Sequence, residues 1–333
     1  MSRQKYNKKN GIVTSIVVSL ILIAITYLLI YNKQFIIDQV TVWQYSANSE
    51  IVGITNRTGM SENGKFIFYA SQPIIDSTNR INSLCNRIEN TTSILGCYSN
   101  NRIYIYNVTD EQLDGVCEVT ATHEMLHAVY VRMGDDEKAT VDKLLETEYN
   151  KLVGNKEFAD LIAYYGRSEP GQRSNELHSI IGTEITNISP ELESHYNKYF
   201  SNRQKVVELN AKYSGVFKIL KGKADALNTQ IDGLFEIITA SKAQYESDTS
   251  ALSADISSFN TRAVSQGFTS QTQFNLERSV LVNRTTALDE MRNNISKDIT
   301  KYNLLVVEHD AIATESNKLL KSMDSSLAPA PSI

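Results

Sequence analysis

The 333-residue sequence has few prolines, few cysteines and no excess of basic residues. None of its five prolines lies between Glu191 and Ala328, so this long segment lacks the residue that interrupts helices most strongly. Three cysteines are too few to build a disulfide scaffold, so the folded parts must rely on a hydrophobic core. The formal net charge of -5 argues against a nucleic-acid-binding surface, and we expect no nucleic-acid partner.

The three cysteines allow one disulfide. Cys85 and Cys97 are the local pair, which would leave Cys117 as a free thiol, but the sequence does not decide this connectivity. Because no Cys-x-x-Cys pair occurs, a zinc site built from cysteines is disfavoured.

An uncharged apolar run occupies residues 11–31, from Gly11 to Tyr31. At about 1.5 Å per residue, a helix of this length crosses a hydrocarbon core roughly 30 Å thick, so we expect one transmembrane helix. Residues 1–10 contain four Lys or Arg and no acidic residue, which predicts a cytoplasmic basic tip and an extracytoplasmic remainder. A cleaved signal peptide is the alternative, but its apolar part is normally shorter, so an uncleaved membrane anchor is favoured.

The middle of the chain mixes strand and helix signals. Residues 32–50 are interpreted as a polar juxtamembrane segment, and 65–69 and 102–108 as strands because they are rich in β-branched and aromatic residues. A short helix is expected at 81–88. Longer helices are expected over residues 116–133, 139–153, 158–165 and 174–186.

From about Gln204 onward, apolar residues recur at alternating spacings of four and three. This pattern is typical of a helix that buries a narrow seam against a partner helix. A polar, Gly-containing stretch at 262–273 separates two such runs, which predicts a long antiparallel coiled-coil hairpin. The expected division is 32–200 for a compact domain, 201–325 for the hairpin and 326–333 for a disordered tail.

Residues 123–127 read His-Glu-Met-Leu-His, an HExxH motif inside a proline-free helical pattern. Residues i and i+4 lie about 40° apart around a helix, so the side chains of His123 and His127 can bind one metal ion. Glu124 follows the first histidine, where its carboxylate can take a proton from water activated by the metal. We therefore expect a Zn²⁺ site with Glu124 as the catalytic base.

A catalytic zinc needs a third protein ligand. The HExxHxxGxxH continuation is absent, so we expect the ligand on the later helical segment that begins 46 residues after His127. Glu176 is the chosen ligand on this segment. Glu184 and His178 are the alternatives, either as metal ligands or as groups that support a ligand.

The HExxH motif followed at this distance by a helical glutamate resembles the gluzincin zinc metallopeptidases, with a spacing closest to the lethal-factor-like members. The resemblance covers roughly residues 103–188 and implies an α+β zincin-like domain that is mostly helical with a small sheet. It also implies an oxyanion-stabilising group, for which Tyr165 and Tyr164 are candidates beside His178. The family's acidic residue four positions after the glutamate is Ile180 here, so support for a ligand must come from elsewhere, with Glu184 as one source. The resemblance further implies an edge strand that binds extended substrate, at Ile103, Tyr104, Ile105 and Tyr106.

These observations predict a membrane-anchored, extracytoplasmic zinc peptidase, an endopeptidase rather than an exopeptidase, that acts on a peptide or protein substrate. The hairpin would position the catalytic domain, bind a protein partner or gate the active site. The alternative is a cell-envelope scaffold that works through its coiled coil and carries an inactive zincin-like domain. No side-chain pattern indicates the cleavage specificity.

Overall fold

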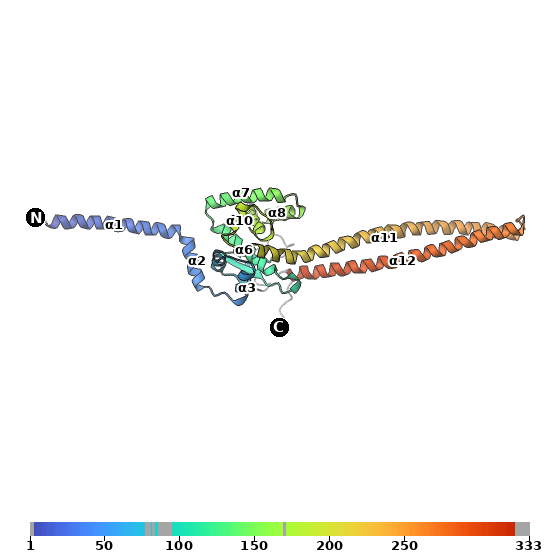
Figure 1. Ribbon diagram of the computed structural model, residues 1–333, viewed down its shortest axis with the longest axis horizontal. Coiled ribbons are helices and arrows are strands. Elements are labelled where there is room, and N and C mark those ends of the chain that lie inside the picture. Colours follow the sequence, from blue (N-terminus) through green and yellow to red (C-terminus); the bar gives the residue numbers. More distant parts are fainter. Residues whose placement is uncertain (1–2, 77–80, 82–83, 86–94, 169–170, 324–333) are drawn as a thin grey trace. The chain divides into compact units, whose positions relative to one another are not determined.

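The computed structural model describes residues 3–76, 81, 84–85, 95–168 and 171–323. It confirms the expected fold class: a mostly helical chain with a small mixed sheet, an apolar N-terminal helix and a long C-terminal helix pair (Figure 1). The chain divides into two compact units, Met1–Val216 with Leu319–Ile333, and Phe217–Lys318. The predicted tail at 326–333 and most of the predicted helix at 81–88 lie outside the described residues. The finer domain boundaries drawn from the sequence stay predictions.

Two helices begin the chain. Helix α1 (Arg3–Tyr31) contains the 19-residue stretch Val13–Tyr31, which is long and apolar enough to cross a membrane and is not buried in the protein. Such a helix fits either a signal sequence or an anchor. Helix α2 (Lys33–Gln44) follows it, so the interpretation of this region as a polar segment is wrong: it is a helix with exposed apolar side chains.

The sheet has three strands in the order β1-β3-β2, formed by Ile74–Asp76, Arg102–Tyr106 and Gly96–Ser99 respectively. Strand β3 pairs in parallel with β1 and antiparallel with β2. It is therefore the central strand, and the prediction of an edge strand at Ile103, Tyr104, Ile105 and Tyr106 is wrong. Both of its hydrogen-bonding edges are already used, because β1 and β2 occupy them.

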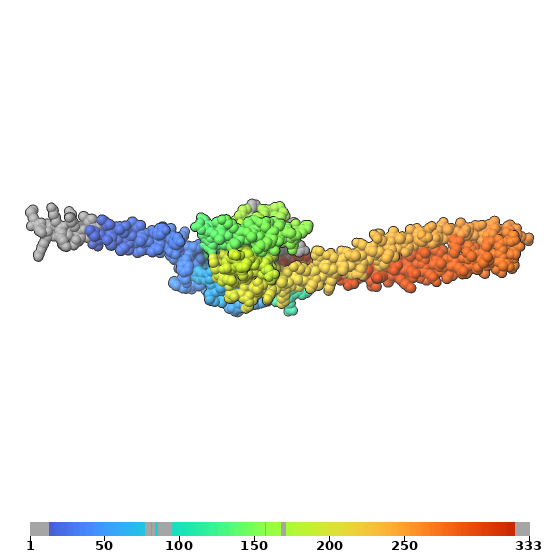
Figure 2. Space-filling model, turned by 45° about the horizontal axis from the view of Figure 1, so that its top comes forward, coloured from blue at the N-terminus to red at the C-terminus, as the bar shows by residue number. Residues whose placement is uncertain are grey.

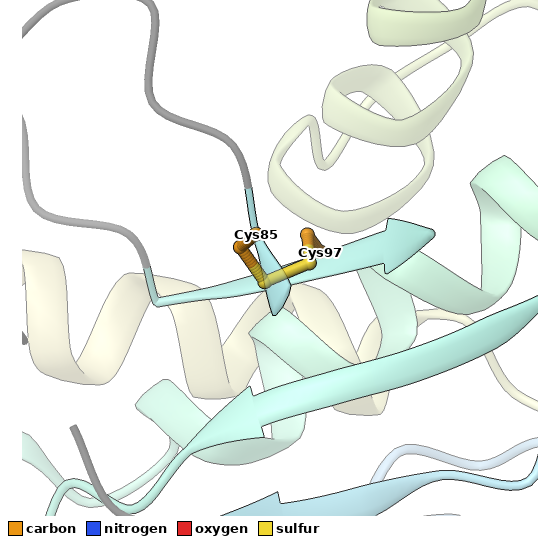
Figure 3. Close-up of a disulfide and its surroundings, with 2 residues drawn as sticks. All are labelled: Cys85 and Cys97. Atoms are coloured by element: carbon orange, nitrogen blue, oxygen red, sulfur yellow. A yellow bond between two sulfur atoms is a disulfide. The ribbon is translucent and has the colours of Figure 1, made fainter. Parts of the chain in front are cut away.

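Side chains of β3 alternate between two apolar clusters, as the strand period requires. Ile103 and Ile105 are fully buried in the main core, whereas Tyr104 packs with Ile81 and Cys85 on the opposite face. Cys85 is joined by a disulfide to Cys97 of β2 (Figure 3). The local cysteine pair is thus the one that forms, and Cys117 is a free thiol.

Helices supply the rest of this unit. Helix α3 spans Ser49–Arg57 and α4 spans Glu62–Ala70. The strand predicted at 65–69 is wrong, because the Ser61 side chain accepts a hydrogen bond from the Gly64 amide and so caps a helix there. The further helices are η1 (Glu111–Leu113), α6 (Val116–Arg132), α7 (Asp135–Leu152), α8 (Lys156–Ser168), α9 (Arg173–Glu184) and α10 (Pro190–Tyr196). They confirm the four helices expected between residues 116 and 186.

The C-terminal pair consists of α11 (Gln204–Val264) and α12 (Gln271–Met323), which lie side by side and antiparallel (Figures 1 and 2). Seam residues at the predicted spacing are buried or half-buried, and three phenylalanine rings pack together at the turn, with centroids 5.0–5.2 Å apart. Across the pair, Arg284 donates to Asp255 at 2.6 Å. Within the unit Phe217–Lys318, the buried seam residues are Leu227, Leu234, Leu252, Phe259 and Ile295.

Candidate metal centre

The HExxH motif lies on α6, at the centre of the first unit. Gly115 precedes this helix with a φ of +107°, a conformation that favours glycine, and a Cβ there would come within 3.0 Å of the Leu209 carbonyl oxygen. Most of α6 from Val116 to Val129 is buried, so its position is fixed by packing on several sides. The helix therefore holds His123 and His127 on one face of a rigid element.

Helix α9 packs against α6 and carries Glu176. The two helices approach closely at Gly182, where an added Cβ would lie 2.5 Å from Leu126 Cδ1 and 2.8 Å from Tyr196 Cε1. A glycine at this point lets α9 lie directly on α6. The packing brings together side chains that are about 50 residues apart in the sequence.

The side chains of His123, His127 and Glu176 form a compact cluster, with one potential ligand atom from each within 4.8 Å of the others. Glu176 Oε1 lies 3.3 Å from His127 Nε2, and Glu176 Oε2 lies 3.6 Å from His123 Nε2. The carboxylate thus stands beside both imidazoles. Among the described residues, this group of His, Cys, Asp and Glu side chains is the one close enough to hold a metal ion.

The ring of His127 is held by two polar groups of α9. Its Nδ1 lies 2.9 Å from Asn175 Oδ1 and 3.3 Å from Ser179 Oγ. Because an amide oxygen only accepts hydrogen bonds, the pair with Asn175 places the proton on Nδ1 and leaves the Nε2 lone pair facing Glu176. This is the arrangement in which a histidine binds a metal through Nε2.

Sequence reasoning missed Asn175 and Ser179. They flank Glu176 and are four residues apart, so they share a helix face, and that spacing is the signal that would have found them. Ile180, four positions after Glu176, is apolar and cannot donate or accept a side-chain hydrogen bond. Support for His127 comes from an amide and a hydroxyl, and a supporting role for Glu184 stays a prediction.

Burial keeps both histidines neutral. It lowers the pKa of His123 and of His127 to about 4, and for His127 the nearby Glu176 carboxylate opposes this effect only in part. At neutral pH both rings therefore carry a free lone pair. A neutral imidazole is the form that binds a metal ion.

Glu124 is buried beside the cluster, next to the edge strand β2. A Cβ at Gly96, the first residue of β2, would lie 3.4 Å from Glu124 Cγ and 2.6 Å from Thr120 Cγ2. The strand backbone therefore packs directly on the α6 turn that carries Glu124. Only a residue without a side chain allows this approach.

The structure separates Glu176 from its two alternatives. His178 places its Nε2 2.9 Å from His195 Nε2 and stacks on the ring of Tyr196, so it is engaged with α10. Burial raises the pKa of Tyr213 on α11, and the charge of Glu184 at the end of α9 raises it further, so Glu184 lies near α11. Neither belongs to the cluster with His123 and His127.

The two tyrosines considered as oxyanion stabilisers lie on α8. Their rings contact each other edge to face, and Tyr165 also packs on the main core. Helix α8 in turn packs on α9. The role of Tyr164 and Tyr165 in stabilising an oxyanion stays a prediction.

The donor set fits zinc. Ligand atoms that are about 2.0–2.1 Å from one tetrahedral metal ion lie roughly 3.3 Å from one another. Glu176 approaches His127 with one oxygen at 3.3 Å and His123 with the other at 3.6 Å, so both separations are close to this value, and all three ligand atoms lie within 4.8 Å of one another. Two imidazoles and one carboxylate leave a fourth position for water, as in catalytic rather than structural zinc sites.

Searches against protein-family models, curated proteins and solved structures found no match to this chain. The geometry of the cluster formed by His123, His127 and Glu176 is therefore the basis for proposing a function.

Proposed function

We propose that the protein is a membrane-anchored, extracytoplasmic zinc-dependent peptidase. The observation that carries the proposal is the placement of Glu176 against the two HExxH histidines, with the buried Glu124 next to them on the same helix. A purely structural zinc site normally has four protein ligands, so three ligands and an additional carboxylate favour catalysis.

In this proposal His123, His127 and Glu176 would hold a zinc ion, which would supply Lewis acidity for a peptide carbonyl and for water. Glu124 accepts a proton from the attacking water and passes it to the nitrogen of the departing amine. Asn175 and Ser179 keep the His127 ring in the metal-binding orientation. The burial of Glu176 and Glu124 limits competing hydration of both carboxylates.

We place the substrate along β2 rather than β3. In the described part of the chain, β2 pairs with a strand on one side only, and Gly96 brings it against the Glu124 stem. An extended peptide can add to such an edge through main-chain hydrogen bonds. This mode of binding suits an endopeptidase, because the substrate chain can continue in both directions.

The apolar stretch Val13–Tyr31 serves in this proposal as an uncleaved anchor. The basic residues that precede it orient residues 1–10 toward the cytoplasm and the metal centre outward. A disulfide between Cys85 and Cys97 is in keeping with an oxidising compartment.

The test uses the full chain in detergent, with zinc content measured by mass spectrometry and cleavage measured on a library of internally quenched peptides. Glu124→Gln removes the proton acceptor but no zinc ligand, so we expect full zinc content and a loss of activity of roughly 10²–10⁴-fold. Glu184→Gln on α9 is the matched control and should keep both. Full activity in Glu124→Gln, or a wild-type chain that neither contains zinc nor takes it up, would contradict the proposal.

A second candidate is a cell-envelope scaffold that works through α11 and α12. It is favoured by large apolar side chains left exposed on the hairpin, such as Phe235, Leu304 and Val307. Protein capture by the hairpin without zinc uptake or cleavage would favour this alternative.

A further inference from the structure

Helix α2 turns a polar side toward the protein. Asp38 is only 4% exposed, and its two carboxylate oxygens accept hydrogen bonds from Arg132 Nε and Nη2, each at 2.9 Å. Gln34 donates to the same carboxylate at 2.9 Å. A helix on the surface of a water-soluble protein normally presents apolar residues to the core and polar residues to solvent. The inward side of α2 departs from this rule at Asp38, while Phe35 packs on Phe66 of α4 with ring centroids 5.8 Å apart and Val42 is half-buried.

The outward side of α2 is apolar except for Lys33 and Gln44, which lie at the two ends of the helix. At 100° per residue, four large side chains lie within an arc of roughly 120°, centred about 160° from Asp38. Their exposed fractions are 39% for Ile36, 45% for Ile37, 41% for Val40 and 77% for Trp43. In the residues that form α2, the charged side chains are Lys33 at its start and the buried Asp38. No acidic group therefore interrupts the apolar face.

The position of α2 in the chain indicates what covers this face. The apolar stretch of α1 ends at Tyr31, and α2 begins at Lys33. Trp43 follows Tyr31 by twelve residues, so a helical path separates them by no more than about 18 Å. If α1 spans a bilayer, the face formed by Ile36, Ile37, Val40 and Trp43 cannot be far from the lipid headgroups.

We propose that this face of α2 lies in the headgroup region of the membrane and binds lipid directly. The proposal rests on the membrane anchor of the proposed function and adds a second, peripheral lipid contact to it. Tryptophan is enriched at the membrane–water interface, and a helix with one apolar face and little negative charge binds in the plane of that interface. A lysine at its start, Lys33, also suits anionic headgroups.

Helix α2 also connects the candidate metal centre to the membrane surface, through the pair between Asp38 and Arg132. Arg132 is the last residue of α6, the helix that carries His123 and His127, and it also donates to Tyr98 Oη of β2 at 3.0 Å. The pair between Asp38 and Arg132 therefore joins the lipid-binding helix to both the metal-binding helix and the edge strand. Lipid binding by α2 would hold the metal centre at a defined distance from the bilayer.

Trp43 is the sole tryptophan of the chain, so its fluorescence reports on this face alone. The full chain is reconstituted into phosphatidylcholine–phosphatidylglycerol vesicles, some of which contain lipids brominated near the headgroup or near the chain end. We expect headgroup-proximal bromine to quench roughly half of the emission, terminal bromine to quench clearly less, and acrylamide to quench weakly. The double variant I36S/V40S should lose much of the bromine quenching and gain several-fold acrylamide access, while it still sediments with the vesicles through α1.

The matched control is Val52→Ser on α3, a valine of similar exposure outside this face, which should leave both kinds of quenching unchanged. Emission that acrylamide quenches freely while the protein sediments with vesicles overturns the α2 proposal but leaves the anchor intact. Protection from both quenchers also overturns it, because protein rather than lipid then covers the face. A full chain that does not sediment with vesicles contradicts the anchor, and the α2 proposal fails with it.

Discussion

Asn175 is the residue that orients the His127 ring, through the 2.9 Å contact between its Oδ1 and Nδ1. Its own amide nitrogen donates to Gln172 Oε1 at 3.1 Å, so the amide is held from both ends. Such partners of a metal-binding histidine restrict its rotation and fix its tautomer.

Asn175→Ala should therefore weaken zinc binding by roughly 10–100-fold while the ligands stay in place. The affinity is measured by competition with a chromophoric chelator. Asn150→Ala, at an exposed site on α7, should leave the affinity unchanged. An Asn175→Ala protein with wild-type zinc affinity would show that the contact does not orient the ring.

His195 makes the stability of this unit dependent on pH. Burial, with a smaller contribution from Lys198, lowers its pKa to about 4. Between this value and the ordinary 6.5, the unfolded chain binds a proton that the folded chain does not, so the free energy of unfolding rises with pH. The contribution of His195 is full above about pH 6.5 and is lost as the pH falls toward 4.

We expect His195 to account for about 2 kcal/mol of lost stability between pH 7 and pH 5. His178, whose pKa is also lowered by burial, acts in the same direction. Hydrogen exchange of the α9 and α10 amides, measured at both pH values, gives the change. His195→Gln keeps a hydrogen-bonding side chain but cannot titrate, so it should flatten the pH dependence; an equally steep dependence would argue against this assignment.

At the scale of helices, the close approach of α6 and α9 determines where Glu176 lies. A Cβ at Gly182 would overlap Leu126 and Tyr196, whereas one at Gly53 on α3 meets no atom within 4 Å. Both glycines lie inside helices, so alanine raises helix propensity equally at the two sites. The difference in stability between Gly182→Ala and Gly53→Ala therefore measures the effect of packing at Gly182.

Gly182→Ala should cost about 1–3 kcal/mol of stability and lower the zinc affinity, because α9 must shift away from α6. Gly53→Ala should be neutral or stabilise the protein by up to about 1 kcal/mol. Thermal unfolding and zinc titration of both variants provide the measurement. Equal effects at the two positions would mean that the approach at Gly182 does not position the metal centre.

Two predictions from local sequence patterns differ from the observed secondary structure. Residues 65–69 have the composition of a strand but form part of α4, because the Ser61 cap and the burial of Ile67 and Phe68 favour a helix. Strand β3 was found correctly, yet its place in the sheet was not. Strand order depends on pairing between distant segments, which composition does not encode.

At the scale of the whole molecule, the two compact units have separate buried residues. The hairpin unit depends on a narrow seam in which Leu234 is buried, whereas the metal centre lies in the unit that contains α6 and α9. A change in the seam should therefore act on the hairpin alone.

Leu234→Ala should destabilise the hairpin by roughly 2–4 kcal/mol through the cavity it leaves. Hydrogen exchange should accelerate in the neighbouring parts of α11 and α12 and stay unchanged in α9, and the zinc content should not alter. Ile237→Ala, at an exposed site on α11, is the control. Faster exchange in α9 would indicate that the units are energetically coupled.

Local spacing was sufficient to predict the apolar N-terminal helix, the helix that places His123 and His127 on one face, and the long helix pair. Each depends on residues within a few turns of one another, or on a repeat that continues for many turns. The distance from the HExxH motif to the next suitable helix also limited the third metal ligand to Glu176, Glu184 or His178. The selection of Glu176, the support of His127 by Asn175, the central position of β3 and the buried pairing of Asp38 with Arg132 were decided by tertiary packing. Each of these depends on which side chain of one element meets another, and this becomes defined only when the distant segments are packed together.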